Sequence, residues 1–320
     1  MKPPASLGGA VLAALLGLVP GSGVADGEDP GRVGSMLQTM NRALSSLDYE
    51  GTLVHLQENR LETLHLVHRI DGGRVQERLV SLSGPVMAVT RERDRVTCVM
   101  PDGHPISVKS QAGRNLLRSD RIDPVLLADR YEFLIEGAAR IAGRDTDVLV
   151  IRPRDGLRYG YRLYLDRTSG LPLKSDLIDQ SGEPIEQLMF TSLTLHEGAD
   201  EGAVQTKPQD GPAEVPRTPV PSRWRFEPRP DGFEPTLHDL VRAPSGAEVE
   251  HFVFSDQLSA YSIYIEPDAA EGLEGITRIG AVHAAGRQID GHQVTVVGEV
   301  PSATVQAAIA GVRASTEAIQ

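Results

Sequence analysis

The sequence has a single cysteine, Cys98, among its 320 residues. One thiol excludes an internal disulfide, a zinc site built from several cysteines and an iron–sulfur cluster within one chain. Positive charge is also scarce, because 32 Lys and Arg face 44 Asp and Glu and the formal net charge is -12. A chain this acidic is a poor match for a phosphate backbone, so nucleic acid is not an expected partner.

Familiar catalytic motifs are missing as well. The chain has no Gly-x-Ser-x-Gly elbow, no His-Glu-x-x-His, no Gly-x-x-x-x-Gly-Lys phosphate loop and no Gly-x-Gly-x-x-Gly after a strand. His55, His65 and His68 fall on neighbouring strands, but His65 and His68 are three apart and so point to opposite faces. We therefore expect solvated or hydrogen-bonded strand histidines, no metal, no cofactor and no enzyme, with an unfamiliar enzyme as the third-ranked alternative.

Long apolar runs are absent except at the N-terminus. Residues 1–25 hold one basic residue, an apolar stretch from Ala10 to Val19, and then small residues up to Ala25. This order is typical of a secretory signal peptide cleaved after Ala25. The alternative, an anchor helix, is disfavoured because the run is shorter than the roughly 20 apolar residues that span a bilayer. Since no cysteine lies at the cleavage point to carry a lipid, we expect an exported, soluble protein.

The rest of the chain divides into two units, and the first covers residues 30–197. Apolar residues recur at helical spacing from Gly34 to Leu47, which predicts an amphipathic helix. From Tyr49 to Leu195, short segments rich in Val, Leu and Ile alternate with Asp-Gly and Ser-Gly pairs, the pattern of an antiparallel meander. Asp123 before Pro124 predicts the start of a short helix. The unit is therefore predicted to be α+β, with helices over one sheet face.

Residues 198–222 carry five prolines and few apolar residues, which predicts a linker, with a long ordered surface loop as the alternative. The second unit, residues 223–318, is predicted to be a smaller α/β domain. Its expected strands cover 224–226, 248–254, 261–265, 277–282 and 293–300. A closing helix is expected from Ser302, as its N-cap, to Val312.

Candidate binding residues follow from this layout. A curved sheet roofed by helices can leave an apolar pocket between the layers, although the same side chains can simply fill the core. The candidates for lining such a pocket are Met87, Val89, Leu116, Leu117, Leu126 and Leu127. In the second unit, aromatic residues on adjacent strands either pack internally or form a partner surface: Phe252, Phe254, Tyr261 and Tyr264.

Cys98 shares one face of a predicted strand with Val96 and Met100. This placement predicts a buried and inert thiol in preference to a reactive one or an intermolecular bridge.

Several stretches of the sequence together resemble one family. They are Met36–Asn41, Leu47–Gly51, Tyr131–Phe133, Arg140–Arg144, Val150–Arg152, Arg154–Tyr161, Leu171–Leu177, Arg229–Phe233 and Val296–Pro301. These stretches lie in both units, and with them the chain resembles the MucB/RseB proteins, periplasmic regulators of the envelope-stress sigma factor.

The resemblance implies a first domain similar to the lipoprotein carriers LolA and LolB, an unclosed antiparallel barrel covered by helices, followed by a smaller α/β domain. It implies a periplasmic protein that binds the periplasmic part of a single-pass anti-sigma factor of the RseA or MucA type and shields it from proteolysis. Lipid or lipopolysaccharide acyl chains are the implied release signal. Our own hypothesis places their pocket in residues 30–197 and most of the partner contact in the smaller domain. The alternative is a periplasmic carrier of lipid or lipoprotein, and the sequence leaves formation of a homodimer open.

Overall fold

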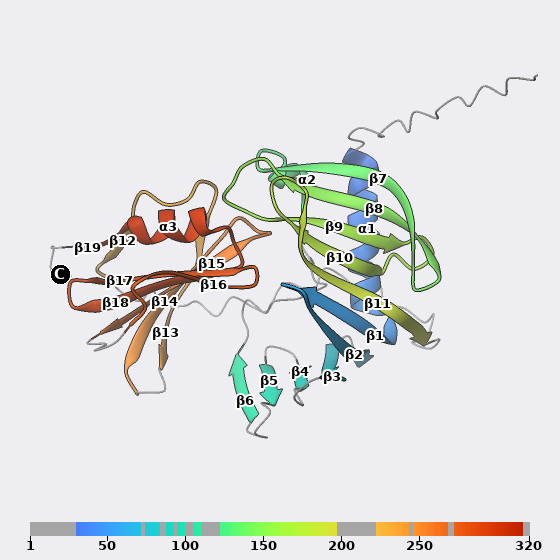
Figure 1. Ribbon diagram of the computed structural model, residues 1–320, viewed down its shortest axis with the longest axis horizontal. Coiled ribbons are helices and arrows are strands. Elements are labelled where there is room, and N and C mark those ends of the chain that lie inside the picture. The colour runs from blue at the N-terminus through green and yellow to red at the C-terminus, as the bar shows by residue number, and fades with distance from the viewer. Residues whose placement is uncertain are drawn as a thin grey trace, which may run out of the picture.

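The computed structural model describes residues 30–71, 74–83, 88–92, 95–99, 105–109, 122–196, 222–242, 246–267 and 272–315. Within these ranges, an 11-stranded sheet forms a first domain and a six-stranded sheet forms a second, and the two domains lie side by side (Figure 1). The predicted signal peptide and nearly all of the predicted linker lie outside the described residues. None of the described helices is long and apolar enough to cross a membrane.

The first domain is one antiparallel sheet with two helices. Its strand order is β6-β5-β4-β3-β2-β1-β11-β10-β9-β8-β7, so β6 and β7 are the two edges and the sheet does not close on itself. The elements are α1 (Pro30–Ser46), β1 (Asp48–Gln57), β2 (Arg60–Asp71), β3 (Arg74–Ser81), β4 (Ala88–Glu92), β5 (Arg95–Val99), β6 (Pro105–Lys109), α2 (Pro124–Leu127), β7 (Tyr131–Ile141), β8 (Arg144–Pro153), β9 (Gly160–Asp166), β10 (Pro172–Ile178) and β11 (Pro184–His196). The predicted unclosed sheet with covering helices is confirmed.

The helix α1 covers one face of this sheet and runs across its strands (Figure 1). Its buried side chains recur every three or four residues, as helical periodicity requires; they are Val33, Leu37, Met40, Ala43 and Leu44. They pack with inward-facing strand residues, among them Leu53, Leu149 and Phe190. The predicted helix is confirmed and begins one turn earlier than expected. The short helix α2 also starts where predicted, because the Asp123 side chain accepts hydrogen bonds from the backbone N–H groups of Val125 and Leu126.

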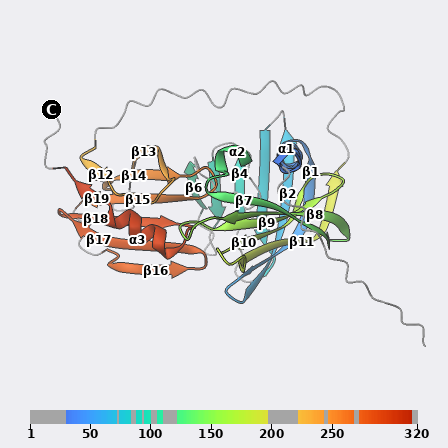
Figure 2. The ribbon, with the colours of Figure 1, turned by 90° about the horizontal axis from the view of Figure 1, so that it is seen from above.

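The second domain contains β12 (Trp224–Phe226), β13 (Glu234–Arg242), β14 (Glu248–Ser255), β15 (Ala260–Pro267), β16 (Gly275–Ile279), β17 (Val282–Ile289), β18 (His292–Gly298), α3 (Ser302–Ala310) and β19 (Val312–Ala314). The six-stranded order is β13-β14-β15-β18-β17-β16, and β12 pairs with β19 separately. Seen from above, α3 lies over the β17 and β18 side of the sheet (Figure 2). The helix buries Val305 and Ala308 in the domain core.

Three local predictions in this domain are wrong. The strand expected at 277–282 is two strands, because the chain turns at Gly280, where φ is +59°. Ser302 does not cap α3: it is the first helical residue, and Pro301 before it takes the cap position without a side-chain hydrogen bond. The helix ends at Ala310 rather than Val312, since Val312 pairs with Phe226 as a strand residue. The strand β13 was not anticipated.

Candidate functional site

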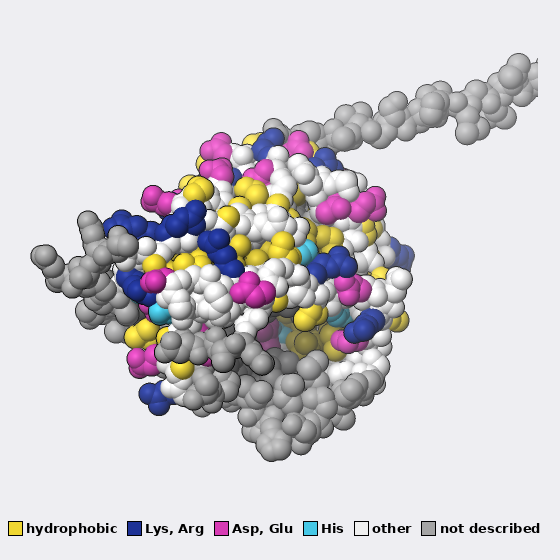
Figure 3. All heavy atoms as spheres, turned by 60° about the vertical axis from the view of Figure 1, so that its left-hand side comes forward, with side chains coloured by type: hydrophobic (Ala, Val, Ile, Leu, Met, Phe, Trp, Pro, Cys, Tyr) yellow, Lys and Arg dark blue, Asp and Glu magenta, His cyan; other side chains and the backbone are white. Residues whose placement is uncertain are grey.

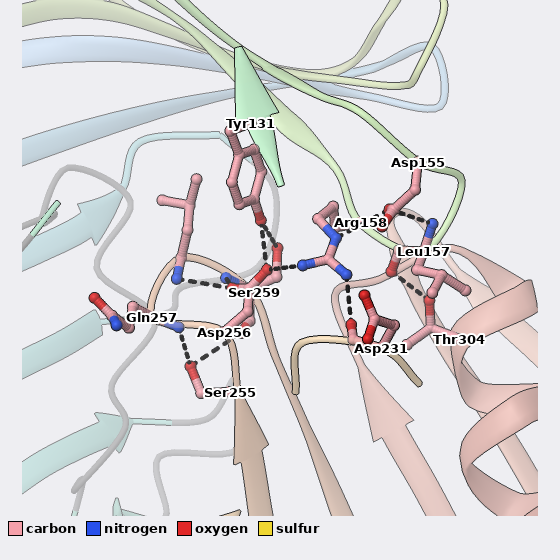
Figure 4. A network of polar contacts seen from close by, with 11 residues as sticks. Tyr131, Asp155, Leu157, Arg158, Asp231, Ser255, Asp256, Gln257, Ser259 and Thr304 are labelled. Carbon is pink, nitrogen blue, oxygen red and sulfur yellow. Dashed lines mark hydrogen bonds and ion pairs between the residues drawn. The ribbon is translucent and has the colours of Figure 1, made fainter. Parts of the chain in front are cut away.

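The most distinctive group of polar side chains lies where the two domains meet. Arg158, in the loop between β8 and β9, is the largest fully buried side chain in the described part of the chain, with 0% exposed. Its Nη1 lies 2.6 Å from Oδ2 of Asp256, in the turn between β14 and β15 of the other domain, and neither side chain is exposed (Figure 4). A buried ion pair therefore joins the domains.

The other nitrogens of Arg158 are engaged as well. Nε donates to Oδ1 of Asp155 at 3.0 Å, and Nη2 donates to the backbone carbonyl of Asp231 at 2.7 Å (Figure 4). The guanidinium carbon also lies 4.9 Å from the ring centre of Phe233 and 5.8 Å from that of Tyr131. Its planar fork thus fixes three segments at once, which a flexible lysine does not reproduce.

The carboxylate of Asp256 is surrounded by donors. Its Oδ2 also accepts from the hydroxyl of Tyr131 at 2.9 Å, and its Oδ1 accepts from the backbone N–H groups of Leu258 at 2.9 Å and Ser259 at 2.6 Å. The Tyr131 hydroxyl lies 3.2 Å from Oγ of Ser259. These bonds offset the cost of burying the charge, and they come from both domains.

The surroundings keep Tyr131 and Arg158 of this network each in one protonation state. Burial raises the pKa of Tyr131 well above its ordinary value, and the neighbouring charge of Asp256 raises it further. Burial alone lowers the pKa of Arg158, but the hydrogen bond with Asp155 and the charge of Asp256 outweigh it, and the pKa is raised. The phenol therefore remains a hydrogen-bond donor and the guanidinium remains a cation. With all three nitrogens of Arg158 and both carboxylate oxygens of Asp256 hydrogen-bonded, the network ties the two domains together.

Apolar contacts flank the network on both sides. Leu157 of the first domain packs against the core of the second, and Leu258 of the second packs against the core of the first. The Thr304 hydroxyl of α3 donates to the backbone carbonyl of Leu157. Each domain thus packs one partly buried leucine against the core of the other, which buries apolar area next to the ion pair.

A second contact lies at the turn between β16 and β17. Ala281 is fully buried in a cluster with Tyr159 and Leu177 of the first domain. An open pocket of about 520 Å³ lies beside Tyr159. Its walls come from two hairpin loops of the first domain and from the start of α3: Gly156, Arg158, Tyr159, Asp179, Gln180, Ser181 and Pro301.

The predicted pocket residues do not share one environment in the structure. Leu127 is fully buried in the core of the first domain, whereas Leu126 beside it is 58% exposed. Met87, Leu116 and Leu117 lie outside the described residues. Val89 lies on β4, and its side chain is outside the described part, as is that of Cys98 on β5. The pocket stays a prediction.

The predicted aromatic partner surface needs correction. Phe252, Phe254 and Tyr261 are buried in the core of the second domain, where Phe254 and Tyr261 stack with ring centres 5.2 Å apart. These three side chains fill the core because they face the side of the sheet that the rest of the domain covers, so they do not form an exposed surface here. Tyr264 is half-buried and stacks on His251 at 4.4 Å.

Two of the three strand histidines, His55 and His68, form local hydrogen bonds. His55 Nε2 lies 2.8 Å from Oε1 of Glu186, and the buried His68 places Nδ1 3.0 Å from Oε1 of Glu77. The ring of His68 also stacks on Tyr49 at 4.5 Å.

Comparison with known proteins shows which family has this two-domain architecture. The MucB/RseB N-terminal domain family matches residues 32–215, and the MucB/RseB C-terminal domain family matches residues 218–313. The sigma factor AlgU regulatory protein MucB of Pseudomonas aeruginosa is 31% identical over 305 residues, which covers 92% of this chain and 93% of that protein. The sigma-E factor regulatory protein RseB of Escherichia coli K12 is 26% identical over 280 residues, covering 85% and 88% of the two chains.

Solved structures agree with the sequence relatives. The structure of the Pseudomonas aeruginosa MucA/MucB complex matches with a TM-score of 0.67 and 30% identity, over 89% of this chain and 100% of that chain. A crystal structure of MucB matches with a TM-score of 0.62 and 31% identity, over 89% and 98%. The resemblance in the sequence is confirmed in both domains: the chain belongs to the MucB/RseB family.

Proposed function

We propose that this protein regulates an extracytoplasmic sigma factor by binding the periplasmic region of a membrane-bound anti-sigma factor. The observation that carries the proposal is the match, through both domains, to proteins named as sigma factor regulators and to MucB solved in complex with MucA. The signal-like residues 1–25 support a periplasmic location. A band of exposed hydrophobic side chains between charged ones, on the face drawn in Figure 3, suits a protein-binding role.

Binding shields the anti-sigma factor from proteolysis, and lipid or lipopolysaccharide acyl chains release it. The exposed Val125 and Leu126 on α2, next to the buried Leu127 of the apolar core, support an acyl-chain site in the first domain. If lipid and anti-sigma factor favour different domain arrangements, each weakens the other by the same factor. The buried junction at Arg158 and Asp256 is the element through which the first domain controls the second.

The test is a titration of a fluorescent periplasmic fragment of the MucA-type anti-sigma factor from the same genome into the full chain lacking residues 1–25. We expect saturable binding that a lipid A analogue weakens by roughly 5- to 150-fold. A protein that binds the analogue but not the fragment would instead be a lipid carrier. Binding of the fragment that lipid leaves unchanged would remove the release mechanism and keep the partner.

A matched pair of variants localises the lipid effect. Leu126 and Leu82 are each 58% exposed, but only Leu126 lies on α2 beside the buried Leu127. We expect Leu126→Asp to reduce the effect of lipid on fragment binding and Leu82→Asp to leave it unchanged. Equal behaviour of the two variants would place the acyl chain elsewhere.

A further inference from the structure

The two large sheets have four edges, and three of them carry features that block pairing with another strand. The edge strand β6 contains Pro105 and Lys109, β7 is bulged around Gly137, and β13 contains Pro235 with a register shift beside it. Proline, lysine and bulges are the usual means by which native sheets protect their edges. The fourth edge, β16, has no proline and an unbroken register with β17, and its one charged residue, Arg278, is paired with Glu58.

Strand β16 is also open to solvent and exposes two isoleucines. All five of its residues are exposed, including Ile276 at 50% and Ile279 at 78%. Ile276 lies opposite Ala285, which belongs to the domain core, whereas Ile279 lies opposite Val282 on the other face. In the described part of the chain, β17 is the one strand paired with β16. An added strand there would gain main-chain hydrogen bonds and an apolar neighbour on each face.

The first domain extends this edge. Glu58, at the tip of the β1–β2 hairpin, pairs with Arg278 of β16 at 3.1 Å, and Gln57 lies against Gly280. Figures 1 and 2 both show the hairpin tip beside the end of β16. The hairpin carries Leu56 and Leu61, an exposed cross-strand pair. Four of the exposed large aliphatic side chains therefore lie on these two neighbouring elements.

We propose that β16 is the docking site for an extended segment of the periplasmic anti-sigma region, which adds to the six-stranded sheet as a further strand. Its apolar side chains pack on Ile276 and Ile279, and the segment continues toward Leu61 on the hairpin. This proposal rests on the proposed function and assigns the place and conformation of the bound partner.

Charge favours this occupant over a second copy of the chain. Each copy has a formal net charge of -12, so two copies repel each other, most strongly at low salt. A short segment of another protein carries no such obligatory repulsion. Edge pairing also requires an extended backbone, which an unfolded or loosely folded segment adopts without rearranging a folded domain.

The experiment compares two edges of one sheet in the full chain lacking residues 1–25. The variant Ile276→Lys/Ile279→Lys places charge on β16, and Leu240→Lys does the same on β13, where Leu240 is 44% exposed. Binding of the fluorescent periplasmic fragment should weaken at least about tenfold in the first variant and by less than about twofold in the control. Both variants should keep the thermal midpoint of the parent, since the substituted positions are exposed.

The outcomes separate this proposal from the proposed function. If the parent protein does not bind the fragment, the proposed function fails. If the parent binds and the β16 variant binds equally well, the proposed function stands and docking at β16 is refuted. Sedimentation that shows a dimer in the parent and a monomer in the β16 variant, with unchanged fragment binding, makes this edge a contact between copies and also refutes it. Hydrogen exchange should show fragment-dependent protection at β16 and none at β13.

Discussion

The buried pair between Arg158 and Asp256 allows a sharp test of what holds the two domains together. Replacing Asp256 by Asn keeps the size and shape of the side chain and removes its charge. The cation of Arg158 then remains fully buried, with Asp155 as its nearest carboxylate. Since the side chain of Asp155 is about one-third exposed, it is a weaker compensating charge.

The size of the effect follows from burial. Removing one partner of a fully buried ion pair costs about 3–5 kcal/mol, because an unpaired charge is left in a medium of low dielectric. The amide also turns an NH₂ group toward at least one of the donors that Asp256 accepts from, namely Arg158, Tyr131 or the backbone N–H groups of Leu258 and Ser259. We therefore expect Asp256→Asn to lower the free energy of unfolding by about 3–5 kcal/mol.

Urea unfolding followed by tryptophan fluorescence and circular dichroism measures this loss. The single tryptophan, Trp224, lies in the core of the second domain and reports on it. The control is Arg167→Ala, which breaks the exposed pair with Asp147 and should cost about 1 kcal/mol or less. The double variant Arg158→Met/Asp256→Asn should lose less than the sum of its single variants, because no lone charge remains. A loss in Asp256→Asn no larger than in the control would refute the assigned role of the pair.

Three further predictions concern backbone space and pH. Gly51→Ala should destabilise the first domain by about 1–3 kcal/mol in thermal unfolding, because a Cβ there would lie 2.3 Å from the Ser192 carbonyl oxygen. Gly34→Ala in α1 should stabilise it by about 0.5–1 kcal/mol, because a Cβ there meets no atom within 4 Å and alanine favours the helix. The free energy of unfolding should fall above about pH 10, because the raised pKa of Tyr131 keeps its phenol protonated in the folded state, whereas the same phenol ionises in the unfolded chain. The variant Tyr131→Phe should make this decline shallower by up to about 1.4 kcal/mol per pH unit. Burial alone raises the pKa of Asp166, but hydrogen bonds from Arg144 and Ser169 outweigh burial, and the pKa is lowered. The stabilising effect of Asp166 should therefore be lost below about pH 4. The variant Asp166→Asn should make the free energy of unfolding less dependent on pH in that range.

The sequence predicts most elements of the fold because their signals are local. The helix α1 follows from apolar spacing, α2 from Asp123 before Pro124, and many strands of the first domain from the turn residues between them. The strand β13 is missed because it is an exposed edge with little alternation between buried and exposed residues. The turn at Gly280 is missed because the apolar residues before and after it read as one continuous strand.

The domain junction was not predictable in the same way. Arg158 and Asp256 are 98 positions apart, and each resembles a surface charge in its own stretch of sequence. Arg158 does fall within the stretch Arg154–Tyr161 that resembles the family, but resemblance carries no information about its partner. The aromatic residues on β14 and β15 were ambiguous, since aromatic side chains on neighbouring strands suit a core and a binding surface equally.

The junction and the proposed docking edge are mechanically connected. The β16 edge meets the β1–β2 hairpin only while the domains keep the orientation that Arg158 and Asp256 hold. A lipid that favours parted domains would separate Leu61 from Ile279 without touching either residue, and so would weaken a segment bound across both. Because coupling between two ligands is reciprocal, the bound segment would equally disfavour lipid entry. An interface centred on one buried ion pair, with small apolar contacts beside it, is therefore suited to transmit a signal from the first domain to a partner on the second.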